Sequence, residues 1–149
     1  MRCFVTILLF TAAFNATANI APDEVGLHIG SFHSSKQFTD FNPGVNASWG
    51  AWTVGAFRNS EAKNSVFAGY SIDTKGVTAL DLRASLMAGA ATGYAARQVT
   101  MILVPSLNMK IADGQPNGLV KQTRLVLTYI PKLEKQGAHA LHVSLRFVL

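Results

Sequence analysis

The sequence predicts an all-β protein, a single eight-stranded antiparallel up-and-down β-barrel that is transmembrane. Short runs that alternate apolar and polar residues recur along the chain, and glycine, asparagine, aspartate and serine separate them. After residue 18 no stretch holds about 18 consecutive apolar residues, so we expect no transmembrane helix. Only 14% of the residues are charged, well below the roughly 25% of typical soluble domains.

The first segment of the chain has the features of a secretory signal peptide. Arg2 precedes an apolar stretch, and the small residues Ala16, Thr17 and Ala18 follow it. We therefore expect cleavage near Ala18, with a signal peptide at 1–18 and one barrel domain at 19–149. Cys3 is the single cysteine and would leave with the signal peptide, so no disulfide or thiolate metal site is expected.

The first four strands are predicted from period-two alternation between turn-forming segments. The first alternates Val25, Leu27 and Ile29 with polar or small residues, and the second opens after a turn at Pro43 and Gly44. The third follows a tight turn, and the polar segment NSEAKNS separates it from the fourth. The predicted ranges are 25–33, 43–50, 52–59 and 65–73.

The last four strands follow the turn segments DTKG, ATGYAARQ, ADGQPNG and PKLEKQG. The final strand alternates most regularly, with Leu141, Val143, Leu145 and Phe147 on one face. An even strand count puts both chain ends on the periplasmic side of an outer-membrane barrel. The predicted ranges are 78–90, 99–111, 122–130 and 139–149.

One face of every predicted strand is apolar, and the environment of that face decides between two kinds of barrel. In a soluble calycin-like barrel it points inward, which leaves a solvent surface dominated by glycine and serine. In an outer-membrane barrel it faces lipid, and the polar face fills the lumen. Tyr70, Tyr129, Trp49 and Trp52 lie near strand ends, where interfacial aromatic girdles form. The sequence therefore favours the membrane barrel.

The polar face predicts a network of charges inside the barrel. Asp81 and Arg83 share one face of a predicted strand, and a lone buried charge would be costly, so pairing is expected. Eight strands leave room only for side chains, which predicts a filled lumen and no wide pore. The predicted members of this lumen network are His28, Asp81, Arg83, Arg124 and Arg146.

Seven pieces of the chain, in order, resemble an uncharacterised family of small exported proteins from bacteria and their phages, of outer-membrane barrel type. The resemblance covers nearly all of the chain after residue 18 and implies an architecture but no activity. The overall size also resembles that of the eight-stranded outer-membrane barrels used for adhesion, host protection and lipid modification. The pieces are LHIGSFH, FNPGVNASW, VGAFRNSEAKNSVFAGY, ATGY, VPSLNMKI, LTYIPK and ALHVSLRF.

Closure of the barrel would pair the first and last strands and bring together a rim cluster of His33, Ser34 and His139. On the last strand, His142 and Ser144 share a face because strand side chains repeat every two residues. A histidine base beside a serine nucleophile is the arrangement used for acyl transfer.

This His-x-Ser pair also resembles that of the outer-membrane lipid A 3-O-deacylases, in which a carboxylate orients the histidine. Asp40 or Glu134 would have to supply that carboxylate here. The sequence departs from that family at Leu145, where the family has asparagine. These four residues, His142, Ser144, Asp40 and Glu134, are the candidate catalytic residues.

The expected function is non-enzymatic, at the outward loops or through the properties of the membrane. The chain has no basic run with interleaved aromatic residues, so nucleic acid binding is not expected. The spacing of its histidines predicts no metal site, and no cofactor is expected. The expected location is the Gram-negative outer membrane of the cell envelope, in contact with its lipid and with an extracellular or phage/host surface partner. The alternatives are an outer-leaflet lipid acyl hydrolase and a soluble periplasmic barrel that binds an apolar ligand.

Overall fold

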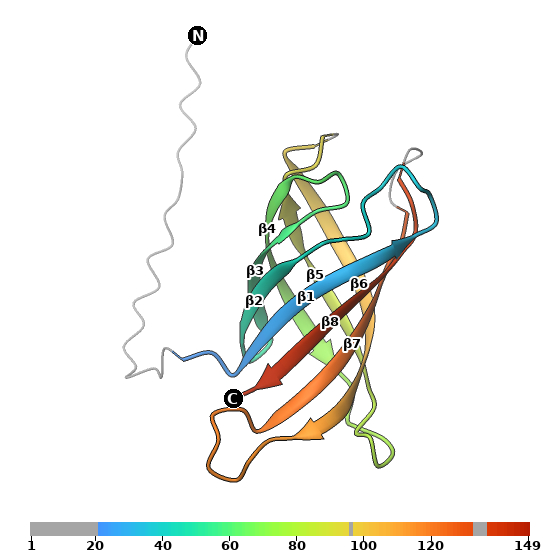
Figure 1. The fold of residues 1–149 in the computed structure, drawn as a ribbon. Helices are drawn as coiled ribbons and strands as arrows, with labels where there is room; N and C mark the ends of the chain where they lie inside the picture. Colours follow the sequence, from blue (N-terminus) through green and yellow to red (C-terminus); the bar gives the residue numbers. More distant parts are fainter. Residues whose placement is uncertain (1–20, 96, 133–136) are drawn as a thin grey trace.

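A computed structural model describes residues 21–95, 97–132 and 137–149, which form a closed barrel of eight antiparallel strands (Figure 1). Each strand pairs with its neighbours in sequence, and β8 pairs with β1 to close the sheet. The predicted barrel fold is therefore confirmed. The strands are β1 (Glu24–His33), β2 (Gly44–Trp49), β3 (Trp52–Arg58), β4 (Asn64–Asp73), β5 (Arg83–Thr92), β6 (Val99–Asp113), β7 (Gln122–Ile130) and β8 (Ala140–Val148).

Seven of the predicted strands agree with these bounds to within two residues, but the fifth prediction is wrong at its start. The first five residues of the predicted strand 78–90 belong instead to a folded loop, residues 74–82, which is closed by a bridge between Val77 and Leu82. Thr78 and Asp81 have φ angles of 71° and 46°, in the left-handed region. Extended strand backbone does not pass through that region, so β5 begins only at Arg83. No helix in the described ranges is long and apolar enough to cross a membrane.

Burial in this barrel is the reverse of that in a soluble domain. The outer face carries large apolar side chains, among them Met101 at 73% exposed and Phe32 at 68%. The buried side chains are mostly polar. The soluble alternative required the apolar face to point inward, and the structure contradicts it. The buried polar residues are Ser31, Asn42, Ser48, Asn59, Ser65, Asn108, Arg124, His142 and Ser144.

The first residue of β1 and the last residue of β8 lie at the same end of the barrel, which we call the terminal end (Figure 1). The segments after β2, β4 and β6 also lie there. The segments after β1, β3, β5 and β7 lie at the other end, the loop end. Exposed aromatic side chains lie near both ends of the outer face. Trp52 and Tyr70 form an edge-to-face pair 5.1 Å apart near the terminal end, and Tyr129 lies near the loop end.

A β-bulge in β1 decides which of its side chains point into the lumen. The register with β8 shifts between His28 and Gly30, so that His28 lies opposite Ser144 and Ser31 lies opposite His142. Unbroken alternation from His28 would point Phe32 inward. The bulge instead buries Ser31 and leaves Phe32 on the outer face.

Candidate functional site

The lumen has two chemically different parts, a charged cluster at the terminal end and a cavity that opens at the loop end. We call the charged cluster the plug. The structure places four of the five predicted lumen-network residues in it, whereas His28 lies in the wall of the cavity. The plug consists of Glu24, Asp73, Asp81, Arg83, Asn108, Arg124 and Arg146.

Arg124 on β7 is the centre of the plug and is only 2% exposed. Its Nε donates to Asn108 Oδ1 at 2.8 Å, and its Nη1 donates to Asp81 Oδ2 and to Gln122 Oε1, both at 2.7 Å. Its Nη2 donates to the backbone carbonyl of Asp81 at 2.5 Å. All three guanidinium nitrogens are therefore paired, as a buried charge requires.

Asp81 reaches the plug from the folded loop 74–82 rather than from a strand. Its carboxylate also accepts hydrogen bonds from Arg83, at 3.1 Å from Nε and 2.6 Å from Nη2. The hydrogen bonds from Arg83, and after them those from Arg124, lower the pKa of Asp81 from 3.8 to about 2. The carboxylate lies directly over Gly76, where a Cβ atom would overlap it.

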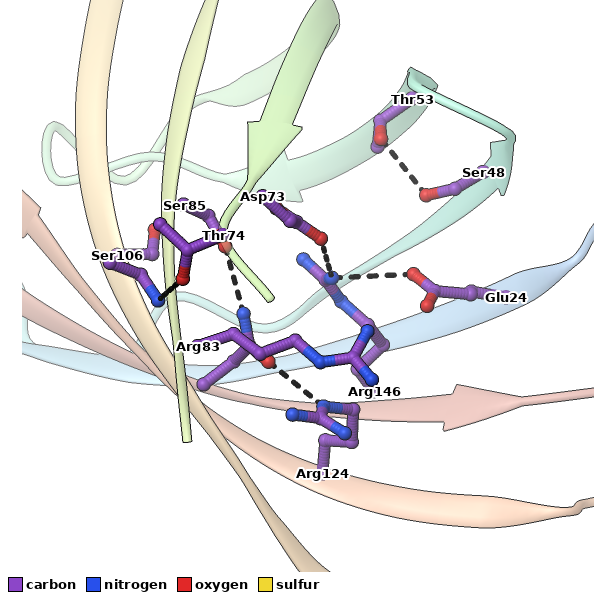
Figure 2. Close-up of polar contacts among 12 residues, drawn as sticks. Glu24, Ser48, Thr53, Asp73, Thr74, Arg83, Ser85, Ser106, Arg124 and Arg146 are labelled. Carbon is purple, nitrogen blue, oxygen red and sulfur yellow. Dashed lines mark hydrogen bonds and ion pairs between the residues drawn. The ribbon is translucent and has the colours of Figure 1, made fainter. Parts of the chain in front are cut away.

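Arg146 on β8 completes the plug. Figure 2 shows Asp73 and Glu24 reaching its guanidinium group, and the ion-pair distances from its Nη1 are 3.9 Å and 3.3 Å. The plug thus combines three arginines with three carboxylates, a formally neutral set. Such a set fills the terminal end of the lumen without leaving a net buried charge.

Between the plug and the loop end, the lumen contains a cavity of about 970 Å³. The prediction of a filled lumen is therefore wrong for this half of the barrel. Small residues explain the difference, since Gly26, Ala91, Ser71 and Ser85 line the cavity where larger side chains would fill it. The apolar part of the wall is made by Phe57, Phe67, Met87, Ile102, Val104 and Val126.

Three polar side chains in the cavity wall form a short hydrogen-bonded relay. His142 Nδ1 lies 2.8 Å from Ser31 Oγ, and His142 Nε2 lies 2.8 Å from His28 Nδ1. Two proton arrangements satisfy both contacts. In one, Ser31 donates to His142 and His142 donates to His28; in the other, His28 donates to His142 and His142 donates to Ser31. The ring of His28 also packs against Phe57 and Phe67, at centroid distances of 5.9 and 5.8 Å.

The relay differs from the predicted catalytic arrangement. Ser144 lies on the same face of β8 as His142, but both ring nitrogens of His142 face other partners. Asp40 contacts His33, whose Nδ1 donates to Asp40 Oδ1 at 2.8 Å, rather than His142. This hydrogen bond lowers the pKa of Asp40. Glu134 lies outside the described residues.

The predicted rim residues lie at the loop end, where they connect the segments beside β1 and β8. Ser34 N donates to the carbonyl of His139 at 2.9 Å, and His139 N donates to Ser34 Oγ at 3.0 Å. Tyr129 donates its hydroxyl to His139 Nδ1 at 2.7 Å. His33 instead pairs with Asp40, which holds the segment between β1 and β2 over the cavity mouth.

Two residues of the site were not predicted from the sequence, Ser31 and Asn42. Asn42 lines the cavity and is 3% exposed, and neither atom of its amide group has a hydrogen-bond partner among the described residues. A buried unpaired amide costs roughly 1–3 kcal/mol, which a ligand with matching polar atoms would offset. No group of three or more potential metal-ligand side chains occurs in the described part of the chain.

Comparison with protein-family models and with curated proteins finds no match. Among solved structures, the chain is similar to the solution NMR structure of the de novo designed protein TMB2.3, with a TM-score of 0.54 and 14% sequence identity. The alignment covers 89% of this chain and 98% of the designed one. At this identity the likeness shows the fold alone, so the resemblance to exported bacterial and phage proteins remains a prediction. What the comparison establishes is the architecture, a closed eight-stranded antiparallel barrel.

Proposed function

We propose that the protein is a β-barrel of the Gram-negative outer membrane that binds a small amphiphilic molecule in its outward-facing cavity. The single observation that carries this proposal is the division of one lumen into a paired plug and an open cavity of about 970 Å³. A lumen that the plug closes at one end would hold a small molecule rather than conduct ions. Binding would take place on the outward side of the membrane, with the signal peptide at 1–18 directing export.

The outer face supports insertion in a membrane. Most of its strands have 9 to 15 residues, and about 9–11 tilted residues suffice to cross the hydrocarbon core. Apolar side chains cover the outer face between aromatic residues near both ends. An exposed apolar surface that surrounds a whole molecule would aggregate in water, but lipid would cover it.

The cavity wall supports an amphiphilic ligand rather than a purely polar one. The apolar residues Phe57, Phe67, Val104 and Val126 suit a hydrocarbon group. Asn42 offers an unpaired amide for a polar group of the same molecule. The volume is at the upper end of the roughly 300–1,000 Å³ that is usual for small-molecule sites.

Photo-crosslinking in lipid vesicles tests the proposal. A single-chain amphiphile with a diazirine in its alkyl chain is added to the full barrel, and the labelled residues are mapped by mass spectrometry. We expect label on the lumen-facing Met87 and Val104, and a non-photoreactive analogue in excess should compete for it. Label confined to outer-face residues such as Leu86 and Leu103 would show that the cavity takes up no amphiphile.

A matched pair of variants separates cavity binding from contact with bulk lipid. Met87 lines the cavity, whereas its neighbour Leu86 is exposed on the outer face. Met87→Trp reduces the cavity volume and should remove the lumen label, while Leu86→Trp should leave it unchanged. Equal labelling in both variants would contradict the proposed site.

Cell fractionation tests the membrane location independently. The protein should sediment with outer membranes and require detergent for release. Recovery in the periplasmic supernatant without detergent would overturn the membrane part of the proposal.

A further inference from the structure

We propose that Ser31 is the nucleophile and His142 the general base of an acyl-ester hydrolase site in the cavity wall. The inference rests on the proposed function, because it names the bound amphiphile as a carboxylic ester. It also replaces Ser144, the serine singled out by the sequence, with a serine from the opposite end of the chain.

The geometry of Ser31 is that of an activated hydroxyl group. Its Oγ lies 2.8 Å from His142 Nδ1, within the range for proton transfer to a general base. Ser31 lines the cavity, so an ester held there has access to it. In the proton arrangement in which Ser31 donates to His142, His142 Nε2 donates to His28 Nδ1 at 2.8 Å, and His28 acts as a positioning residue that orients the base.

Two backbone features fix Ser31 in this position. The bulge between His28 and Gly30 turns Ser31 into the lumen, opposite His142 on β8. The Ser31 backbone N–H donates to the carbonyl of Asp40 at 2.8 Å, so the segment between β1 and β2 holds it from above. A Cβ at Gly30 would lie 2.6 Å from that same carbonyl, so glycine is required for the close approach.

The reaction would proceed in two balanced steps. Ser31 Oγ forms a bond to the ester carbonyl carbon while its proton passes to His142 Nδ1. The bond to the alcohol oxygen then breaks, the alcohol leaves with that proton, and the acyl group remains on Ser31. A water molecule from the loop end then forms a bond to the acyl carbon while one of its protons passes to His142 Nδ1. The bond between the acyl carbon and Ser31 Oγ breaks, His142 returns the proton to Ser31 Oγ, and the carboxylic acid leaves.

The surroundings suit an ester of a hydrocarbon-chain acid. The relay stands beside Phe57 and Phe67, which would pack along the chain. Asn42 lines the same cavity, and its Nδ2, unpaired among the described residues, would donate to the carbonyl oxygen, where negative charge develops. The third member of the relay is a neutral imidazole rather than a carboxylate. It would stabilise the protonated base less strongly, so we expect slow turnover.

Labelling with a fluorescent alkyl fluorophosphonate tests the site in the full barrel reconstituted in vesicles. The wild type should be labelled, and peptide mapping should place the label on Ser31. Ser31→Ala should abolish labelling, and His142→Gln should slow it by ~100-fold or more, the usual contribution of a general base. Ser48→Ala removes a buried serine hydroxyl near the terminal end, outside the cavity, and should label like the wild type.

His28 is tested by a rescue experiment. His28→Phe removes the acceptor for His142 and should slow labelling by ~10-fold or more, whereas His28→Gln keeps an acceptor and should restore most of the rate. Resistance to unfolding on unheated gels verifies that each variant is folded. Equal rates for the two His28 variants would overturn its positioning role.

The outcomes separate this inference from the proposed function. Lumen photo-crosslinking without fluorophosphonate labelling would overturn the hydrolase site and leave amphiphile binding in place. Label on Ser144 would overturn the assignment to Ser31. If no amphiphile crosslinks in the lumen, the binding proposal fails, and a short-chain fluorophosphonate that still labels Ser31 would support the nucleophile alone.

Discussion

The plug and the cavity occupy the same lumen, but they differ in how completely their buried polar side chains are hydrogen-bonded. In the plug, every guanidinium nitrogen of Arg124 has a partner, and Asn108 in turn donates to Ser85 at 2.8 Å. In the cavity, the buried amide of Asn42 has no hydrogen-bond partner within the described part of the chain. Fully paired networks stabilise and fix a structure, whereas unpaired groups cost stability unless a ligand satisfies them. The comparison assigns stability to the terminal end and binding to the loop end.

The largest effect is expected from removing the centre of the plug. Arg124→Met would remove a charged hydrogen-bond donor from Asp81, Asn108 and Gln122 at the most buried charged position of the plug. Breaking a buried charged network of this kind costs on the order of 3–5 kcal/mol. The measurement is the urea midpoint of the refolded barrel, and Arg58→Met at an exposed position is the control. A similar midpoint for both variants would show that the plug does not stabilise the barrel.

A smaller and more local effect is expected at Gly76. Gly76→Ala would place a methyl group in the position of the Asp81 carboxylate, so the loop must shift and loosen the plug. We expect a several-fold higher ion leak in planar bilayers, while amphiphile labelling in the cavity stays unchanged. Gly50→Asn is the control, because Gly50 has a φ of 56° with open space around it, and asparagine tolerates that conformation. Equal leak in both variants would argue against a seal at this end.

Acid should weaken the plug within a defined pH range. Asp81 has a pKa of about 2 in the folded barrel and 3.8 ordinarily, so its pairing contributes fully above about pH 4 and is lost as the pH falls toward 2. The urea midpoint should therefore fall between pH 4 and pH 2. In Asp81→Asn the fall across this window should be smaller than in the wild type. An identical pH profile for the two proteins would place the acid sensitivity elsewhere.

The sequence allowed the eight strands and their outer faces to be predicted, because period-two alternation depends only on local side-chain order. It also identified His142. It did not identify Ser31, since the bulge between His28 and Gly30 becomes visible only when β1 is paired with β8. The turn at DTKG was predicted, but the rest of the loop, residues 78–82, was assigned to a strand because Thr78 is β-branched and such residues rarely adopt a positive φ. The alternation predicts which side chains face the lumen but not how much of the lumen they fill. The cavity was therefore not predicted.

The smallest effect tests whether the loop 74–82 stores strain in order to present Asp81. Thr78 is exposed and holds a φ of 71°, which costs a non-glycine residue roughly 1–2 kcal/mol. Thr78→Gly removes this cost but adds about 0.5–1 kcal/mol of backbone entropy. We therefore expect a net gain of up to about 1.5 kcal/mol in the free energy of unfolding, seen as a higher urea midpoint. Thr78→Val keeps the β-branch and should give no gain. If Thr78→Gly instead destabilises the barrel and raises its ion leak, the threonine side chain itself holds the loop in place. The plug would then depend on a contact of Thr78 rather than on backbone conformation alone.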